Sequence, residues 1–431
     1  MAKANMMTHS HLHLRPDPSR TVIRPFMPED PPAFAVEGHP RAQRIAERVL
    51  GLDEAGLREE LAHIMPSLAS RHRDVEALLL RRFGEVSGLL ADGRSIGRER
   101  KLLIEAYFCE EYSFEAAALF NPSMVLHPDQ SNLPPNRIRF LLSLRGIGEG
   151  HVSSATFRTG SWGPEAGFVV DPPSGLAVPP RIEQPVDGDG DDVVRLRCDG
   201  SRDVSETVLF PVTSRQRQGI EDVRLVRFTE DDGGVCYLGT YTAFDGRTAR
   251  TELLYCSDFR TFLMQPLIGA AAGSKGMALF PRKIGGRFVM LGRQDNENIW
   301  LLDSDDIHRW EGGRKLVTPH WPWEFVQLGN CGSPIEIDEG WLVLTHGVGM
   351  ARNYCMGARL LDKRDPSRIL ARTAAPLLHP SARERDGYVP NVVYSCGGLV
   401  HDRTLLVPYG VADNFATFAS VPLEGLLATM S

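Results

Sequence analysis

The runs Ile220-Glu221-Asp222-Val223-Arg224-Leu225-Val226-Arg227-Phe228 and Val235-Cys236-Tyr237-Leu238-Gly239-Thr240-Tyr241 decide the fold class. Both are rich in β-branched and aromatic residues, and the turn Gly233-Gly234 lies between them, which is typical of a β-hairpin. Similar short runs recur later and earlier in the chain, at Arg137–Ser143, Val152–Phe157, Phe288–Leu291, Trp341–Leu344 and Thr404–Val407. Many short strands with turns between them predict an all-β sandwich, barrel or propeller.

Asp222, near the start of the first run, is the first candidate for a catalytic acid. A strand end on a rigid sheet can hold a carboxylate in place and still leave it open to a ligand. The alternative is a solvated turn residue, which is the commoner role of an acidic residue at such a position.

The composition excludes several classes of protein. The chain has 431 residues, 42% hydrophobic and 24% charged, as in an ordinary globular protein. A formal net charge of -7 argues against nucleic acid or an anionic membrane as a partner. No signal peptide or apolar membrane span is evident. Seven cysteines without Cys-x-x-Cys spacing fit reduced thiols, so we expect a cytoplasmic protein without a structural metal.

The character of the chain changes near residue 120. Residues 1–39 are rich in proline and predict an extended arm. Residues 40–119 repeat apolar positions at helical spacing, for example Ile45, Val49 and Leu52, and Asp53 is a plausible N-cap. We therefore expect an N-terminal helical extension followed by a β domain over 120–431.

A weak internal repeat favours the propeller among the β architectures. The segment Tyr255–Phe262 resembles Leu302–Trp310, because each follows a β-type run and places Ser, Asp and an aromatic residue at similar offsets. Successive blades would repeat an outer-strand turn in this way.

Two motifs that suggest ligand sites fail on inspection. Gly146-Ile147-Gly148-Glu149-Gly150-His151 has His where the dinucleotide fingerprint needs Gly, and a strand follows it where a helix is needed. Asp187-Gly188-Asp189-Gly190-Asp191-Asp192 lacks the glycine at position six of a calcium loop. A solvated acidic loop is the better interpretation.

Several basic residues lie beside Gly-rich turns and aromatic residues. Guanidinium groups offer paired donors that match phosphate oxygens, and lysine adds a compact charge. The candidates for a phosphate site are Arg145, His151, Arg158, Arg247, Arg250 and Lys275. Each one taken alone is more commonly a solvated surface group.

Ordered segments of the chain resemble glycoside hydrolase family 130, the β-mannoside phosphorylases and β-mannosidases. The matching segments are Phe120-Asn121-Pro122, Glu221–Arg224, Lys275 with Ala278–Ile284, Gly332–Ile335, His346-Gly347, Asp362, Val389–Val393, and Tyr409-Gly410 with Asp413. The resemblance implies a five-bladed β-propeller behind the N-terminal α-helical extension.

The resemblance also implies the chemistry. The family's Glu-Asp-Pro-Arg motif falls on Glu221-Asp222-Val223-Arg224, with Val223 in place of proline. Asp222 would supply a proton to the glycosidic oxygen, by way of the sugar's 3-hydroxyl, in an inverting reaction on a β-mannoside. Phosphate would then give α-mannose 1-phosphate. The expected substrate-binding residues are Asn121, Glu221, Tyr241, His346, Asn391 and Asp413.

Three functions follow, in order of preference. The first is an inverting phosphorylase that uses inorganic phosphate as co-substrate and needs no cofactor. The second is an inverting β-mannosidase, which needs a second carboxylate to activate water, with Glu149 and then Glu324 as candidates. The third is a non-catalytic glycan-binding propeller, because fold alone does not fix function. A homo-oligomer is compatible with all three.

Overall fold

The computed structural model describes residues 7–35, 38–86, 88, 96–183, 193–381, 385 and 387–431. The acidic run 187–192 lies outside these residues. The chain divides into two compact units, one of residues 19–113 with 175–179 and the other of residues 1–18, 114–174 and 180–431. The predicted arm over 1–39 is thus split between the units, and the change of character predicted near residue 120 falls between Ser113 and Phe114.

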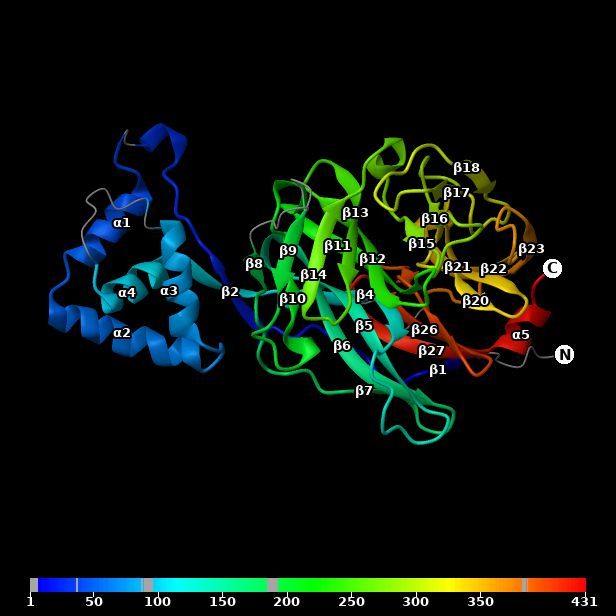
Figure 1. The fold of residues 1–431 in the computed structure, drawn as a ribbon, viewed down its shortest axis with the longest axis horizontal. Helices are drawn as coiled ribbons and strands as arrows, with labels where there is room; N and C mark the ends of the chain where they lie inside the picture. Colours follow the sequence, from blue (N-terminus) through cyan, green and yellow to red (C-terminus); the bar gives the residue numbers. More distant parts are fainter. Residues whose placement is uncertain are drawn as a thin grey trace. The chain divides into compact units, whose positions relative to one another are not determined.

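The smaller unit is mainly helical (Figure 1). Its helices are α1 (Arg41–Leu50), α2 (Glu54–Ala69), α3 (Val75–Val86) and α4 (Arg98–Tyr107), and its strands β2 (Thr21–Pro25) and β3 (Cys109–Ser113) pair antiparallel. The Asp53 carboxylate accepts a hydrogen bond from the Gly56 N–H at 2.8 Å and caps α2, as predicted. Apolar faces of α1, α2 and α4 pack together around Val49, Leu57 and Ile104.

The larger unit is made almost entirely of antiparallel strands, which confirms the predicted β character. Its largest sheet, of 11 strands among the described residues, runs β4-β5-β6-β11-β12-β13-β14-β9-β8, with β7 and β10 on β6. The bounds are β4 (Ala118–Leu126), β5 (Ile138–Ile147), β6 (Ser153–Gly163), β7 (Gly167–Val170), β8 (Arg181–Glu183), β9 (Val194–Arg197), β10 (Val208–Leu209), β11 (Gly219–Thr229), β12 (Val235–Phe244), β13 (Ala249–Cys256) and β14 (Thr261–Pro266).

Three smaller sheets complete the described part of this unit. The first holds β15 (Ala278–Leu279), β16 (Phe288–Gly292), β17 (Ile299–Ser304) and β18 (Arg314–Val317). The second holds β19 (Gln327–Asn330), β20 (Ile335–Ile337), β21 (Gly340–Val348), β22 (Tyr354–Leu361) and β23 (Ile369–Arg372). The third holds β1 (Thr8–His9), β24 (Val393–Tyr394), β25 (Leu399–His401), β26 (Thr404–Val411) and β27 (Phe415–Pro422), and the short helix α5 (Leu423–Ala428) follows it.

The first strand of the chain pairs with the last. Thr8 and His9 of β1 lie opposite Ser420 and Ala419 of β27, so segments about 400 residues apart share one ladder (Figure 1). Central strands such as β21 and β26 are buried along almost their whole length. Their near-continuous apolar runs match this burial on both faces.

Two hairpin turns have the same backbone conformation. The turn 148–151 joins β5 to β6, and the turn 349–352 joins β21 to β22; each contains a 3-10 segment, η3 (Glu149–His151) and η7 (Met350–Arg352). In both turns the last two residues have left-handed φ values, 68° and 56° in the first and 55° and 52° in the second. The shared pattern Gly-Ile/Val-Gly, at 146–148 and 347–349, leads into both.

No helix among the described residues combines the length and the apolar character needed to span a membrane.

Candidate active site

Asp222 sits on a bulge near the beginning of β11. The pairing of β11 with β12 shifts register between Glu221 and Arg224, and Asp222 has a left-handed φ of 53°. Bulges re-aim a side chain, and Asp adopts this conformation more readily than most residues. Hydrogen bonds fix both sides of the bulge, since Ser143 Oγ donates to the Val223 carbonyl and Ser123 Oγ accepts from the Leu225 N–H. The strand thus holds the carboxylate rigidly.

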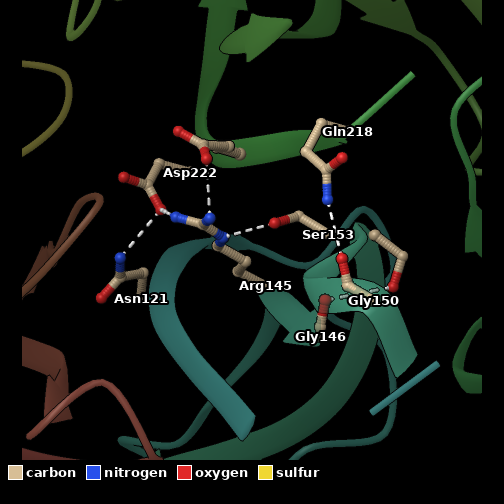
Figure 2. A network of polar contacts seen from close by, with 9 residues as sticks. Asn121, Arg145, Gly146, Gly150, Ser153, Gln218 and Asp222 are labelled. Carbon is tan, nitrogen blue, oxygen red and sulfur yellow. Dashed lines mark hydrogen bonds and ion pairs between the residues drawn. The ribbon is translucent and has the colours of Figure 1, made fainter. Parts of the chain in front are cut away.

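Asn121 lies on a matching bulge in β4 and contacts Asp222. Its φ is 48°, and its Nδ2 donates to Asp222 Oδ1 at 2.8 Å (Figure 2). The backbone of Gly410 packs directly against it, because a Cβ at Gly410 would lie 2.9 Å from the Asn121 nitrogen. The Asn121 side-chain oxygen is buried and has no hydrogen-bond partner among the described residues. A buried acceptor of this kind is satisfied by a ligand or by water.

Arg145 on β5 holds the acidic pair in place. Its Nη2 lies 2.7 Å from Glu221 Oε1, its Nη1 lies 3.5 Å from Asp222 Oδ1, and its Nε donates to Ser153 Oγ at 2.9 Å (Figure 2). One guanidinium group therefore contacts both acids of the motif and the first residue of β6. Glu221, which the sequence predicts to bind substrate, is engaged by this arginine.

The charges around Asp222 favour its ionised form. Burial alone would raise the pKa of this carboxyl group, but the charges of Arg145 and Arg224, the hydrogen bond from Asn121 and the charge of Lys275 together lower it. Asp222 is therefore a carboxylate at neutral pH in the structure, in a strongly cationic setting.

Asp413 is a second carboxyl group in this setting, with the opposite shift. It lies in the turn between β26 and β27 with a φ of 50°. Burial and the nearby charge of Asp222 raise its pKa to about 6, although Arg145 and Arg352 act to lower it. Two carboxyl groups with pKa values pushed apart are a common feature of acid–base sites.

Replacing Asp413 by Asn should raise stability in a pH-dependent way. A carboxyl group whose pKa is higher in the folded than in the unfolded state loses stability as the pH rises from about 4 to about 6. Above that range Asp413→Asn should remove a penalty on the order of 2 kcal/mol, and near pH 4 it should have little effect.

Thermal unfolding at pH 4.5 and pH 8 tests this expectation. Asp402→Asn is a matched control, because Asp402 is exposed and also has a left-handed φ of 44°. An equal change in Tm at both pH values would contradict the assignment to Asp413.

A cationic cluster of buried Arg224 and half-buried Arg293 lies near Asp222. Arg224 on β11 donates from Nη2 to the Tyr394 hydroxyl at 2.5 Å, and Arg293, directly after β16, has its Nη1 3.3 Å from His346 Nε2. Burial and the charges of Arg293 and Arg224 lower the pKa of His346 well below its usual value, so the imidazole is neutral. Its ring stacks on Tyr354 with an interplanar angle of 12°.

These contacts bring together residues from all four sheets of the larger unit. Asn121, Arg145 and Asp222 come from the largest sheet, Arg293 from the end of β16, His346 from β21, and Tyr394 and Asp413 from the last sheet. Lys275 joins them through its charge at Asp222 from an exposed loop position. Of the residues predicted from sequence, the structure thus gathers Asn121, Arg145, Glu221, Asp222, Lys275, His346 and Asp413.

Two predicted site residues belong to the interior instead. Arg158 forms a buried, two-pronged ion pair with Glu115 at 2.7 and 2.9 Å, so its guanidinium group is committed to that carboxylate. The Tyr241 hydroxyl donates to Glu252 at 2.5 Å and accepts from Gln216 at 2.9 Å, and its ring is part of the core. The structure therefore places Arg158, predicted to bind phosphate, and Tyr241, predicted to bind sugar, among interior contacts and apart from the residues around Asp222.

Four further predicted residues lie outside the contacts described above. Arg247 and Arg250 are exposed around the turn between β12 and β13. His151 is exposed in η3 and contacts the ring of Tyr388. The Asn391 carbonyl accepts a hydrogen bond from the Tyr354 N–H at 2.9 Å, and its backbone is left-handed.

Three residues near Asp222 were not predicted as site residues from the sequence: Arg224, Arg293 and Tyr394. Arg224 ends the quoted acidic motif, so it could have been chosen with Asp222. For His346, the Gly-Ile/Val-Gly pattern was a second signal, because Arg145 and His346 both precede that pattern directly. Nothing local marks Arg293 or Tyr394.

Among the described residues, no three His, Cys, Asp or Glu side chains gather as a metal site would require.

The chain matches a family model and curated proteins. A family model described as beta-1,4-mannooligosaccharide phosphorylase matches residues 200–431. The 1,2-beta-oligomannan phosphorylase of Thermoanaerobacter sp. (strain X514) is 32% identical over 250 residues, covering 57% of this chain and 80% of that protein.

Solved structures share the fold. The beta-1,2-mannobiose phosphorylase from Listeria innocua, in complex with beta-1,2-mannobiose, has a TM-score of 0.53 at 22% identity, over 73% of this chain and 92% of that one. A second structure comes from work on glycoside hydrolases of this kind that target beta-1,2 mannosidic linkages in Candida mannan. It has a TM-score of 0.52 at 19% identity, over 72% of this chain and 86% of that one. Since the family model covers more than half of the chain and the bacterial relative is matched over most of its length, the chain belongs to glycoside hydrolase family 130.

Proposed function

We propose that the protein is an inverting glycoside phosphorylase acting on β-mannosides. Phosphate and a β-mannosyl sugar would give α-mannose 1-phosphate and the free sugar. One observation carries the choice of phosphate over water. Arg224 is buried and Arg293 half-buried near Asp222, and neither forms an ion pair with a carboxylate among the described residues.

The two guanidinium groups suit a dianion. Arg224 donates to a neutral phenol, and its Nε has no partner within the described part of the chain, while Arg293 faces a neutral imidazole. Burial lowers the pKa of Arg293, and the charge of Arg224 lowers it further, so the two cations destabilise each other. A bound phosphate would relieve this repulsion and form charge-assisted hydrogen bonds with both. Lys275 would add a third positive charge at the site.

Asp222 would act as the proton donor once phosphate is bound. The cations that keep its pKa low in the structure would then be offset by the negative charge of the phosphate, so the pKa of Asp222 would rise. The proton would move to the glycosidic oxygen by way of the mannosyl 3-hydroxyl, as in the family. The bond between C1 and that oxygen breaks while a phosphate oxygen attacks C1 from the opposite face. The unpartnered Asn121 oxygen would accept a sugar hydroxyl.

The pairing of the strands supports the five-bladed propeller predicted from the family. The largest sheet contains two antiparallel sets, β4 to β7 and β11 to β14, joined by a single parallel residue pair, Gly219 with Ser153. Counted separately, they make five sets with the three smaller sheets. The two matching turns at 148–151 and 349–352 support blades of one kind. Pairing of β1 with β27 would complete the last blade.

Inverting hydrolysis is the second candidate function. Asp413 lies close enough to Asp222 for the charge of Asp222 to raise the pKa of Asp413. Asp413 could therefore activate a water molecule, which would attack where phosphate attacks in the phosphorylase. Glu324 is not suited to this role, because it is fully buried in an ion pair with Arg359 at 2.9 Å and accepts from the His320 N–H. Glu149 is exposed in η3.

The state of the cysteines bears on the compartment in which the protein works. All seven cysteines are free, and burial raises the pKa of buried ones such as Cys198. Free thiols support a reducing compartment, so we infer the cytoplasm.

The deciding experiment supplies β-1,2- and β-1,4-mannobiose with phosphate, with arsenate, or with neither anion. A phosphorylase makes mannose 1-phosphate with phosphate, releases free mannose with arsenate because the ester is unstable, and does almost nothing in plain buffer. Rapid release of mannose without either anion would exclude the phosphorylase and establish the hydrolase.

A further inference from the structure

Two exposed rings meet close to the catalytic residues. The centroids of His151 and Tyr388 are 5.4 Å apart with an interplanar angle of 38°. Tyr388 is 69% exposed, and His151 is exposed as well. The pair therefore presents aromatic surface to solvent, and neither the phosphate site nor the proton donor uses it.

The His151 side of this pair is tied to Arg145. His151 ends η3, whose Gly150 carbonyl accepts from Gln218 Nε2 at 2.7 Å (Figure 2). Two residues farther on, Ser153 accepts from Arg145 Nε, and Arg145 contacts Asp222. Gln218 itself lies four residues before Asp222. The turn that carries His151 is thus held by the same segment that holds the acid.

The Tyr388 side is tied to Asp413. The Val389 N–H donates to the Ala412 carbonyl at 3.1 Å, and the Ala412 N–H donates to the Val392 carbonyl at 2.9 Å. Asp413 follows directly, and its charge interacts with Asp222 and Arg145. Tyr388 is therefore the neighbour of a residue whose backbone bonds to the one before Asp413, and His151 lies two residues before the serine that contacts Arg145.

We propose that His151 and Tyr388 form a platform for the second sugar of the substrate, which is released when the mannosyl group is transferred to phosphate. This inference rests on the proposed function. The cluster of Arg224, Arg293 and Asp222, which is buried or half-buried, would take the phosphate and the mannosyl ring. The departing sugar then needs a more exposed surface next to the acid. Pyranose rings carry apolar C–H faces that pack on aromatic rings, while the Tyr hydroxyl and the imidazole nitrogens can meet sugar hydroxyls.

Kinetics of Tyr388→Ala in phosphorolysis test the platform. With β-1,2- and β-1,4-mannobiose, the KM for the disaccharide should rise roughly 5- to 10-fold, as loss of one aromatic contact predicts. The KM for phosphate should stay within about two-fold, because the platform does not contact the anion site. Tyr388→Phe keeps the ring and should keep most of the affinity. Tyr255→Ala, which removes another partly exposed tyrosine on β13, is the matched control.

Different results would overturn the phosphorylase function and the platform. No mannose 1-phosphate from the wild-type protein with either disaccharide would overturn the proposed function, and the platform with it. An active wild type whose Tyr388→Ala variant has an unchanged KM for both disaccharides would overturn the platform alone. Equal increases in KM for phosphate and disaccharide would also do so, since they would mark a structural role.

Discussion

Replacing Asp222 by Asn should lower kcat by about 10²–10⁴, the usual range for loss of a general acid. The amide cannot supply the proton that the glycosidic oxygen must gain. Binding of mannobiose should change little, because Asn adopts the left-handed backbone of this bulge as readily as Asp, so the local fold is kept. Asp222→Asn therefore separates the effect on turnover from the effect on substrate binding, at a residue whose pKa is lowered by Arg145, Arg224 and Lys275.

Steady-state rates of mannose 1-phosphate formation and calorimetric titration with mannobiose measure the two effects. Asp402→Asn makes the same chemical change at an exposed left-handed position and should leave both quantities unaltered. Turnover of Asp222→Asn close to that of the wild type would remove Asp222 from the mechanism.

Replacing Arg293 by Met should raise the KM for phosphate by about 10²-fold, the cost expected when a buried charge-assisted contact is lost. Methionine fills much of the same space among Tyr354, Tyr394 and His346 without the charge. The KM for mannobiose should change only by about two- to three-fold, because the arginine contacts no sugar in the proposed arrangement. Removing the charge also ends its repulsion with Arg224, so the variant should fold.

Initial rates with phosphate and mannobiose varied independently give both KM values. Arg309→Met, at a half-exposed arginine paired with Glu311, is the matched control. If Arg293→Met weakened both substrates equally, the guanidinium group would be a structural or sugar-binding group, and the phosphate site would have to be sought elsewhere.

Much of the architecture follows from local pattern. Strands such as β11 and β12 form because β-branched and aromatic residues alternate around a Gly-Gly turn, and α2 begins where Asp53 can cap it. Asp222 could be chosen as a candidate because it lies near the start of a β-type run, within the segment that resembles the family motif. These are short-range features that a sequence displays directly.

The partners of buried charges depend on contacts between distant residues. Arg158 resembles a phosphate ligand in sequence, yet Glu115, 43 residues earlier, neutralises it. Tyr241 resembles a sugar-binding tyrosine, yet Glu252 on the adjacent strand takes its hydroxyl. Conversely, Arg293 becomes a candidate because it forms no ion pair with a carboxylate in the part of the chain that the structure describes. Spacing in the chain encodes none of these pairings.

The ladder between β1 and β27 sets an order on biosynthesis. Residues 8 and 9 leave the ribosome long before their partners at 419 and 420 are made. The final sheet therefore cannot be completed during translation, whereas the helical unit, whose strands and helices all lie between residues 19 and 113, can fold while the rest is still being synthesised. A nascent chain stalled before residue 404 would lack both β26 and β27, leaving the N-terminal strand as an exposed edge open to pairing with other chains.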